Sequence, residues 1–194
     1  MGRRDHETGA GGPRPIELRS MNSSRSDRPR MPDGYGVPDT LEGTLSWRAV
    51  EARLVGAMHY WMATTRPDGR PHVVPRWGVW LEERFWYDGS SETVHARNLR
   101  SNDACTLPLD DGARAVILEG TSRPAEPPGP DLGGLLAEAF RRKYADLGYS
   151  PAADAWDGPH AGGLAVFTPA KALAWFDFPG DVTRFRFERA EPGA

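Results

Sequence analysis

The spacing of hydrophobic residues predicts two substantial helices. Over residues 46–58 the apolar positions recur every three or four residues, and Ser46 in front of them is a suitable N-cap. A second run, DLGGLLAEAFRRKYADLG over residues 131–148, has the same period and leaves one apolar and one charged face. Each helix can therefore bury one face against a core.

Short apolar runs separated by turn residues predict strands along the rest of the chain. The segments HYWMATTR and RPHVVPRWGVW flank PDG, while ACTLPL and RAVILEGTSRPAE flank DDG, and both arrangements are typical of hairpins. Further strands are expected in FWYDG and, later, in GLAVFTP, KALAWFDF and VTRFRFE. Strands do not alternate with helices, so we expect a mainly β fold, an antiparallel barrel with inserted helices, because closure removes exposed strand edges.

The strand predicted over residues 71–80 contains a proline and a glycine, which strands seldom accept. One alternating set of its residues is entirely apolar and is expected in the core: Val73, Pro75, Trp77 and Val79. The other set, which includes Arg76, is mixed and is expected to face solvent, a partner chain or a ligand. Two interpretations follow from Pro75 and Gly78: an edge strand with a bulge, or a flat ring lying along residues 75–78.

The segment GSSETVHARNLRSN, residues 89–102, predicts a loop that runs into a short helix. Hydroxyl groups gather at the helix start, where unpaired N–H groups and a partial positive charge suit a phosphate: Ser90, Ser91 and Thr93. Positive charge is added by His95, Arg97 and Arg100. An ordinary capped helix with solvated arginines explains the same pattern.

The first 40 residues show no hydrophobic period and are rich in Gly, Pro, Ser, Arg and Asp. Such a segment buries too little apolar area to offset the entropy of ordering. We therefore predict a disordered tail over residues 1–40 and one domain over residues 41–190.

Composition excludes several functional classes. The formal net charge of −3 disfavours a general nucleic-acid binder, and the single cysteine, Cys105, rules out a disulfide within the chain. No apolar run approaches the length of a membrane span or resembles a signal peptide, so a cytoplasmic protein without membrane contact is expected. The histidines lack paired spacing for a metal, and no Gly-x-Ser-x-Gly motif indicates a hydrolase.

The order of ATTRPDGRPHVVPRWGVW, FWYDGSSETVHARNLRSN, AVILEGTSR, the FRRKY helix and TPAKALAWFDFPGDVTRFRF resembles the pyridoxamine 5'-phosphate oxidase-like split-barrel superfamily. It is most similar to the flavin- and deazaflavin-dependent oxidoreductase branch, over residues 44–188. The resemblance implies an FMN-binding-like split β-barrel and a homodimer with two cofactor sites at the subunit interface. It also implies that the cofactor is FMN or the deazaflavin coenzyme F-420, between which the sequence does not distinguish.

The resemblance also implies where the cofactor binds. Its ring is expected along the strand that carries Val74, Pro75, Arg76 and Trp77, and its phosphate at the helix start with Ser90, Ser91, Thr93, His95, Arg97 and Asn98. Trp175, from a late strand, is brought toward the cofactor of the partner subunit.

One position departs from the family pattern. Many relatives have a lysine at the position of His95, where it contacts the phosphate. A neutral imidazole donates one hydrogen bond but carries no permanent charge, which Arg97 can supply instead. We therefore expect phosphate binding to strengthen as the pH falls through the histidine range.

Three functions fit these patterns. The first is an oxidoreductase that transfers a hydride between the cofactor and a small unsaturated or oxidised substrate, with Arg76 stabilising negative charge and His72 or His95 relaying a proton. The second is non-catalytic binding of a flavin, a deazaflavin or haem on the same barrel. The third, pyridoxamine 5'-phosphate oxidation itself, ranks lowest, because the chain ends in RFERAEPGA without the arginine- and histidine-bearing ending of that enzyme.

Overall fold

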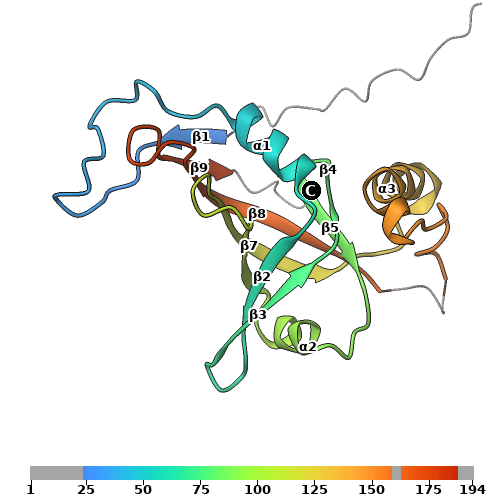
Figure 1. Cartoon of the computed structure of the whole chain (residues 1–194). Coiled ribbons are helices and arrows are strands. Elements are labelled where there is room, and N and C mark those ends of the chain that lie inside the picture. The colour runs from blue at the N-terminus through green and yellow to red at the C-terminus, as the bar shows by residue number, and fades with distance from the viewer. Residues whose placement is uncertain (1–23, 159–162, 188–194) are drawn as a thin grey trace, which may run out of the picture.

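A computed structural model describes residues 24–158 and 163–187, which form one mainly antiparallel β-sheet with three α-helices (Figure 1). The sheet path runs β1-β9-β8-β7-β6-β2-β3, while β4 pairs with β5, and β5 pairs with β8. The path does not close on itself. This confirms the predicted split β-barrel with inserted helices.

Most helices and strands lie where the turn and helix signals of the sequence predict them. The strands are β1 Ser24–Asp27, β2 Tyr60–Thr65, β3 Pro71–Arg76, β4 Val79–Leu81, β5 Arg84–Asp88, β6 Ala104–Pro108, β7 Val116–Pro124, β8 Leu164–Ala174 and β9 Thr183–Phe187. The helices are α1 Trp47–Gly56, α2 Val94–Ser101 and α3 Gly129–Tyr144, the last followed by a 3-10 turn, η1 Ala145–Leu147.

Local chemistry explains the predicted boundaries. The Ser46 side chain accepts a hydrogen bond from the Ala49 amide at 3.3 Å and caps α1 as expected. In the β2–β3 hairpin, Gly69 adopts a φ of 84°, and the Asp68 carboxylate accepts from the Arg70 amide at 3.1 Å. The hairpins predicted at PDG and DDG are confirmed as β2–β3 and β6–β7.

Two hydrophobic clusters hold the elements together. The larger lies inside the barrel, where α1 contributes Trp47, Val50 and Leu54. The smaller packs Leu136, Phe140 and Tyr144 of α3 against β4 and β5. Figure 1 shows α1 and α2 at opposite ends of the sheet and α3 to one side. None of these helices is both long and apolar enough to cross a membrane.

The strand predicted over residues 71–80 is interrupted at Trp77 and Gly78, so that β3 and β4 are separate strands. The Tyr144 hydroxyl accepts from the Gly78 amide at 3.0 Å and lies 2.9 Å from the Gly78 carbonyl oxygen, to which it can donate. A Cβ atom on Gly78 would lie 2.3 Å from the Phe85 ring and 2.5 Å from the Trp86 carbonyl oxygen. The groups that approach Gly78 closely are therefore Phe85 and Trp86 of this chain.

The apolar face of β3 is not in the core, which corrects the prediction for Val73, Pro75 and Trp77. Val73 is 53% exposed and Trp77 is 38% exposed. The mixed face turns inward instead, because its residues pair with the inward-facing residues of β2 and lie under α2. Pro75 lacks a ladder donor and is tolerated because β3 ends the sheet path.

Part of the predicted tail belongs to the sheet. Residues 24–27 form β1, which pairs antiparallel with β9, and Arg184 of β9 donates to both carboxylate oxygens of Asp27, at 2.7 and 2.8 Å. This differs from the disorder predicted for residues 24–40. The prediction for residues 1–23 lies outside the described residues.

Arg28 fixes the segment that follows β1. Its guanidinium donates to the backbone carbonyls of Thr40 and Glu42 on one side and of Gly180 and Val182 on the other. One side chain thereby joins the N-terminal segment to the turn before β9. The polar sequence around it gave no hydrophobic signal for this arrangement.

We predict that Arg28→Ala lowers the free energy of unfolding by about 1–2 kcal/mol, because four carbonyl groups lose a charged donor and turn to water instead. Chemical denaturation followed by tryptophan fluorescence measures the change. Arg30→Ala, at an exposed position in the same segment, is the matched control and should change stability little. Equal effects of the two substitutions would contradict the role of Arg28.

Candidate functional site

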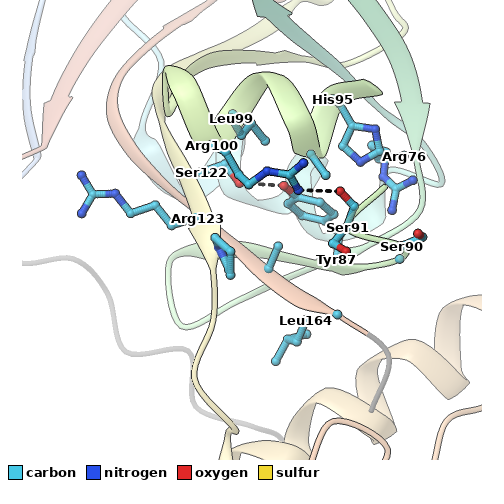
Figure 2. Close-up of a pocket in the computed structure, with 15 residues that line it drawn as sticks. Arg76, Tyr87, Ser90, Ser91, His95, Leu99, Arg100, Ser122, Arg123 and Leu164 are labelled. Carbon is cyan, nitrogen blue, oxygen red and sulfur yellow. Dashed lines mark hydrogen bonds between the residues drawn. The ribbon is translucent and has the colours of Figure 1, made fainter. Parts of the chain in front are cut away.

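A cavity of about 170 Å³ lies where the end of β5 meets the start of α2 (Figure 2). It is lined by residues of β3, β5, α2, β7 and β8 and of the loop between β5 and α2: Arg76, Tyr87, Gly89, Ser90, Ser91, His95, Ala96, Leu99, Arg100, Ser122, Arg123, Pro124, Gly163, Leu164 and Ala165. Pockets that enclose a whole drug-sized ligand measure roughly 300–1,000 Å³. This cavity is therefore suited to one end of a cofactor rather than to all of it.

The wall of the cavity is buried, and its mouth is polar. Tyr87 is buried in the wall, where its hydroxyl lies 2.7 Å from the Ser122 hydroxyl. Leu99 and Leu164 give the cavity apolar sides. Ser90 and Ser91 are exposed, so the hydroxyl groups of the β5–α2 loop meet solvent. A ligand entering here would pass from water into a shielded space.

Arg76 brings a positive charge into this space from β3. Its guanidinium carbon lies 5.2 Å from the centroid of the Tyr87 ring, and one terminal nitrogen donates to the Asp88 carbonyl. The Nε atom is buried and has no hydrogen-bond partner among the residues that the structure describes. Burial lowers the pKa of Arg76 from its usual value, against smaller opposing effects of Tyr87 and Asp88.

The loop leaves room for this guanidinium. Gly89 has a φ of 152°, and a Cβ atom there would lie 3.0 Å from an Arg76 terminal nitrogen. Any larger residue at Gly89 would press on the Arg76 side chain. The glycine in the GSSET segment thus serves the cavity as well as the turn.

Other charges around the cavity already have partners. The nearby Asp88 carboxylate accepts from the Tyr149 hydroxyl and, at 3.0 Å, from the Trp156 indole. Arg100 donates to the Ser91 carbonyl at 2.8 Å. Arg123 pairs with Asp103 and points away from the cavity in Figure 2.

His95 lies beside Arg76 and is only 4% exposed. Its Nε2 atom lies 3.3 Å from the Thr93 hydroxyl oxygen, and its ring centroid lies 6.3 Å from that of Tyr87. Burial, then the charge of Arg76 and the nearby His72, lower the pKa of His95 to about 4. The imidazole is therefore neutral near pH 7, and its titration in the free protein lies below the histidine range expected from the sequence.

Four of the residues predicted to bind the cofactor line this cavity: Arg76, Ser90, Ser91 and His95. Thr93 lies next to it and contacts both Ser90 and His95. The sequence analysis predicted a ring subsite on the strand and a phosphate subsite at the helix start. In the structure Arg76 from the strand and His95 from the helix lie at the same cavity.

Other predicted residues point elsewhere. Val74 packs against the main core, while Pro75 and Trp77 lie on the exposed face of β3. Arg97 is exposed and donates to the Glu92 carbonyl at 2.7 Å. Asn98 is buried and donates to the Thr64 hydroxyl at 2.9 Å.

Trp175 lines a different hollow. This second hollow, of about 670 Å³, also includes Tyr35, Phe176 and Phe178. The Trp175 and Phe178 rings meet edge to face at 5.6 Å. The prediction that Trp175 reaches the cofactor of a partner chain stays a prediction.

Sequence reasoning missed the residues that complete the cavity from β5, β7 and β8, namely Tyr87, Ser122 and Leu164 among others. They come from strands that pair only in the folded sheet: β7 pairs with β8, and β5 with β8. Tyr87 had a weak signal, since it precedes the Ser-rich loop directly. Ser122 and Leu164 had none.

The chemistry of these groups fits an anionic end of a cofactor. A half-buried guanidinium with a buried, unpaired Nε donor and exposed hydroxyls at the mouth are suited to a phosphate group. In the described parts of the chain, no three His, Cys, Asp or Glu side chains are placed to hold a metal ion.

We predict that His95 makes stability depend on pH. Its pKa is about 4 in the folded protein against about 6.5 when exposed, so the unfolded chain takes up a proton first. The contribution is full above about pH 6.5 and is lost as the pH falls toward about 4. His95→Gln should remove about 1–3 kcal/mol of this pH dependence, measured by chemical denaturation at both ends of the range. His59→Gln, at an exposed position, is the control, and identical pH profiles for wild type and His95→Gln would contradict the shift.

Comparison with solved structures finds similar chains at low sequence identity. An F-420 reductase is 23% identical with a TM-score of 0.48, and the match covers 63% of this chain and 94% of that one. A FAD-binding protein from Mesorhizobium loti is 14% identical with a TM-score of 0.51, covering 86% and 98%. A heme binding protein from Mycobacterium smegmatis is 17% identical with a TM-score of 0.51, covering 66% and 54%. At these identities the two matches with a TM-score of 0.51 show the fold alone.

Comparison of sequences gives the family. A search of curated proteins finds no match. The family model described as pyridoxamine 5'-phosphate oxidase matches residues 47–176, from the start of α1 to just beyond β8. This match includes the cavity-lining residues of β3, β5, α2, β7 and β8, and the chain belongs to the pyridoxamine 5'-phosphate oxidase family.

Proposed function

We propose that this protein is an oxidoreductase that transfers a hydride between a bound flavin-type cofactor and a small unsaturated or oxidised substrate. The cofactor is FMN or the deazaflavin coenzyme F-420. The cavity at the β5–α2 junction carries the proposal, because the buried Nε donor of the half-buried Arg76 has no partner among the described residues and a phosphate would supply the acceptor. Membership of the family and the similar fold of a FAD-binding protein support a cofactor of this type.

The cofactor would contact two surfaces of this chain. The cavity would hold the phosphate end, and the ring would extend along the backbone of residues 74–77, next to Arg76. When bound, the flavin or deazaflavin ring supplies the atom that accepts or donates the hydride. Leu99 and Leu164 keep water from the shielded end, and Arg76 stands at the junction, where it favours negative charge.

We also propose that the working form is a homodimer. The outer face of the β2–β3 hairpin exposes large apolar side chains, with Trp61 38%, Val73 53% and Trp77 38% exposed. Trp61 pairs with Pro75, so the apolar positions are contiguous. Patches of this kind mark protein interfaces, and a second copy of the chain would cover this one.

Non-catalytic binding is the alternative on the same barrel. The similar fold of a heme binding protein from Mycobacterium smegmatis supports haem as its ligand. The small volume of the cavity favours the phosphate end of a flavin-type cofactor over a porphyrin, which is wide and rigid.

The cofactor is tested by adding FMN, coenzyme F-420 or haem to the purified protein and recording absorbance spectra after gel filtration. We expect a retained flavin with two near-visible bands or a retained deazaflavin with one, and reduction or oxidation of that chromophore when a suitable substrate is added. Retention of haem alone, with an intense Soret band, would favour the binding protein. Retention of none of the three would contradict the proposal.

The dimer is tested by light scattering at micromolar concentration. We expect twice the mass of the chain for wild type and a monomer for Val73→Glu, since a charge buried at the centre of an interface is costly. Leu147→Glu is a matched control, because Leu147 of η1 is equally exposed, at 53%, and lies outside the apolar face. A Val73→Glu variant that stays dimeric would place the interface elsewhere.

A further inference from the structure

We propose that Arg76, rather than any residue of α2, is the anchoring charge for a phosphate group in this cavity. The inference deepens the proposed function, because the phosphate is taken to be one end of the cofactor. It assigns the charge to strand β3. His95 then acts as a neutral neighbour, and the two arginines of α2, Arg97 and Arg100, are exposed and donate to backbone carbonyls of the β5–α2 loop.

Arg76 carries a half-buried charge with few hydrogen-bond acceptors. A guanidinium always carries a proton, and moving it out of water is costly unless an anion or several acceptors receive its hydrogen bonds. Here the structure gives it one backbone carbonyl, of Asp88, and the face of Tyr87. Its Nε atom is buried without a partner. The described residues thus leave Arg76 undersatisfied, and an anion in the cavity would complete it.

Arg76 also lacks a counter-charge at hydrogen-bond distance in the described part of the chain. No carboxylate of the described residues forms a salt bridge with Arg76. The nearby Asp88 carboxylate accepts from Tyr149 and Trp156 in the cluster under α3. If Arg76 had only a structural role, we would expect it to form a salt bridge with the Asp88 carboxylate.

The other arginines near the cavity are exposed or already paired. Arg97 and Arg100 are exposed, and each donates to a backbone carbonyl of the β5–α2 loop, at 2.7 and 2.8 Å. Arg123 is paired with Asp103. Exposed or paired charges add little to the binding of an anion, while a desolvated one adds much more. His95 is neutral near pH 7 and can only share a hydrogen bond.

The arrangement has an unusual consequence for stability. If Arg76 serves the ligand, its removal should not destabilise the free protein, because the substitution removes a half-buried charge whose Nε atom has no partner among the described residues. If Arg76 serves the fold, its removal should destabilise the free protein and leave anion binding unchanged. The two roles therefore predict opposite patterns for one substitution.

The test uses the whole chain and inorganic phosphate as the probe, near pH 8, with sodium chloride at equal ionic strength as the reference. We expect phosphate to raise the Tm of wild type by roughly 3–6 °C at ten times its Kd. Arg76→Met should keep or raise the Tm of the free protein and lose this phosphate-specific rise. Arg97→Met, a matched removal of a neighbouring exposed arginine, should keep it.

Two further variants keep the test decisive. Arg76→Lys retains a charge without the planar fork and should retain part of the rise, which covers the case in which Arg76→Met fails to fold. His95→Lys in the Arg76→Met background returns a cation to the same cavity, beside the position of Arg76, and should restore the rise. A lower Tm for free Arg76→Met with the phosphate effect intact would overturn the proposal, as would the absence of any phosphate effect in wild type.

Comparison of FMN with riboflavin, which lacks the phosphate, separates this inference from the proposed function. We expect Arg76→Met to weaken FMN binding by about 10- to 100-fold and riboflavin binding little. Equal weakening of both would overturn the role of Arg76 while leaving a flavin site in place. A phosphate effect that depends on Arg76, without binding of any flavin or deazaflavin, would leave the anion site in place and remove the proposed cofactor.

Discussion

The hydroxyl group of Tyr144 holds the point on which the rest of this structure depends. It bonds to both backbone groups of Gly78 and lies 2.9 Å from the Met58 carbonyl oxygen, so that α3 takes over the hydrogen bonds that an unbroken strand would have given to a neighbour. Lys143 adds a bond to the same Gly78 carbonyl at 3.1 Å. Because this bridge ends β3 after Arg76, it decides which way the last side chains of the strand point.

The end of β3 then serves two environments with alternate residues. Arg76 turns inward toward Tyr87 and the cavity, and its neighbour Trp77 turns outward, where its ring stacks on Tyr144 at 4.9 Å. Alternate residues of a strand point to opposite faces of the sheet, and in β3 one face is half-buried and the other is exposed. A ligand on one side and a second chain on the other would each complete a surface that the single chain leaves unfinished.

The sequence predicted the architecture because its signals are local. PDG and DDG specify turns, and a repeat of three to four residues specifies α1 and α3, whatever the remainder of the chain does. β1 escaped prediction because four polar residues, SRSD, carry no pattern; they become a strand only through β9 and the carbonyl groups that Arg28 holds. The inward face of β3 escaped for a related reason, since alternation defines two faces but not which one the sheet covers.

The site was predictable only in part because its chemistry is set by neighbours distant in sequence. The Ser-rich loop and α2 were recognisable from the sequence. The pKa of His95 was not, because it is lowered to about 4 by burial and by the approach of Arg76 from β3, which the sequence does not reveal. Likewise Arg97 and Arg76 look equivalent in a sequence. In the structure Arg97 is exposed to solvent, whereas the Nε atom of Arg76 is buried without a partner among the described residues. The strength of a charge in a protein depends on what it has lost on folding. On folding, Arg76 has lost part of its water without gaining a carboxylate from the described residues, so an anion in the cavity would supply the interaction that its guanidinium lacks.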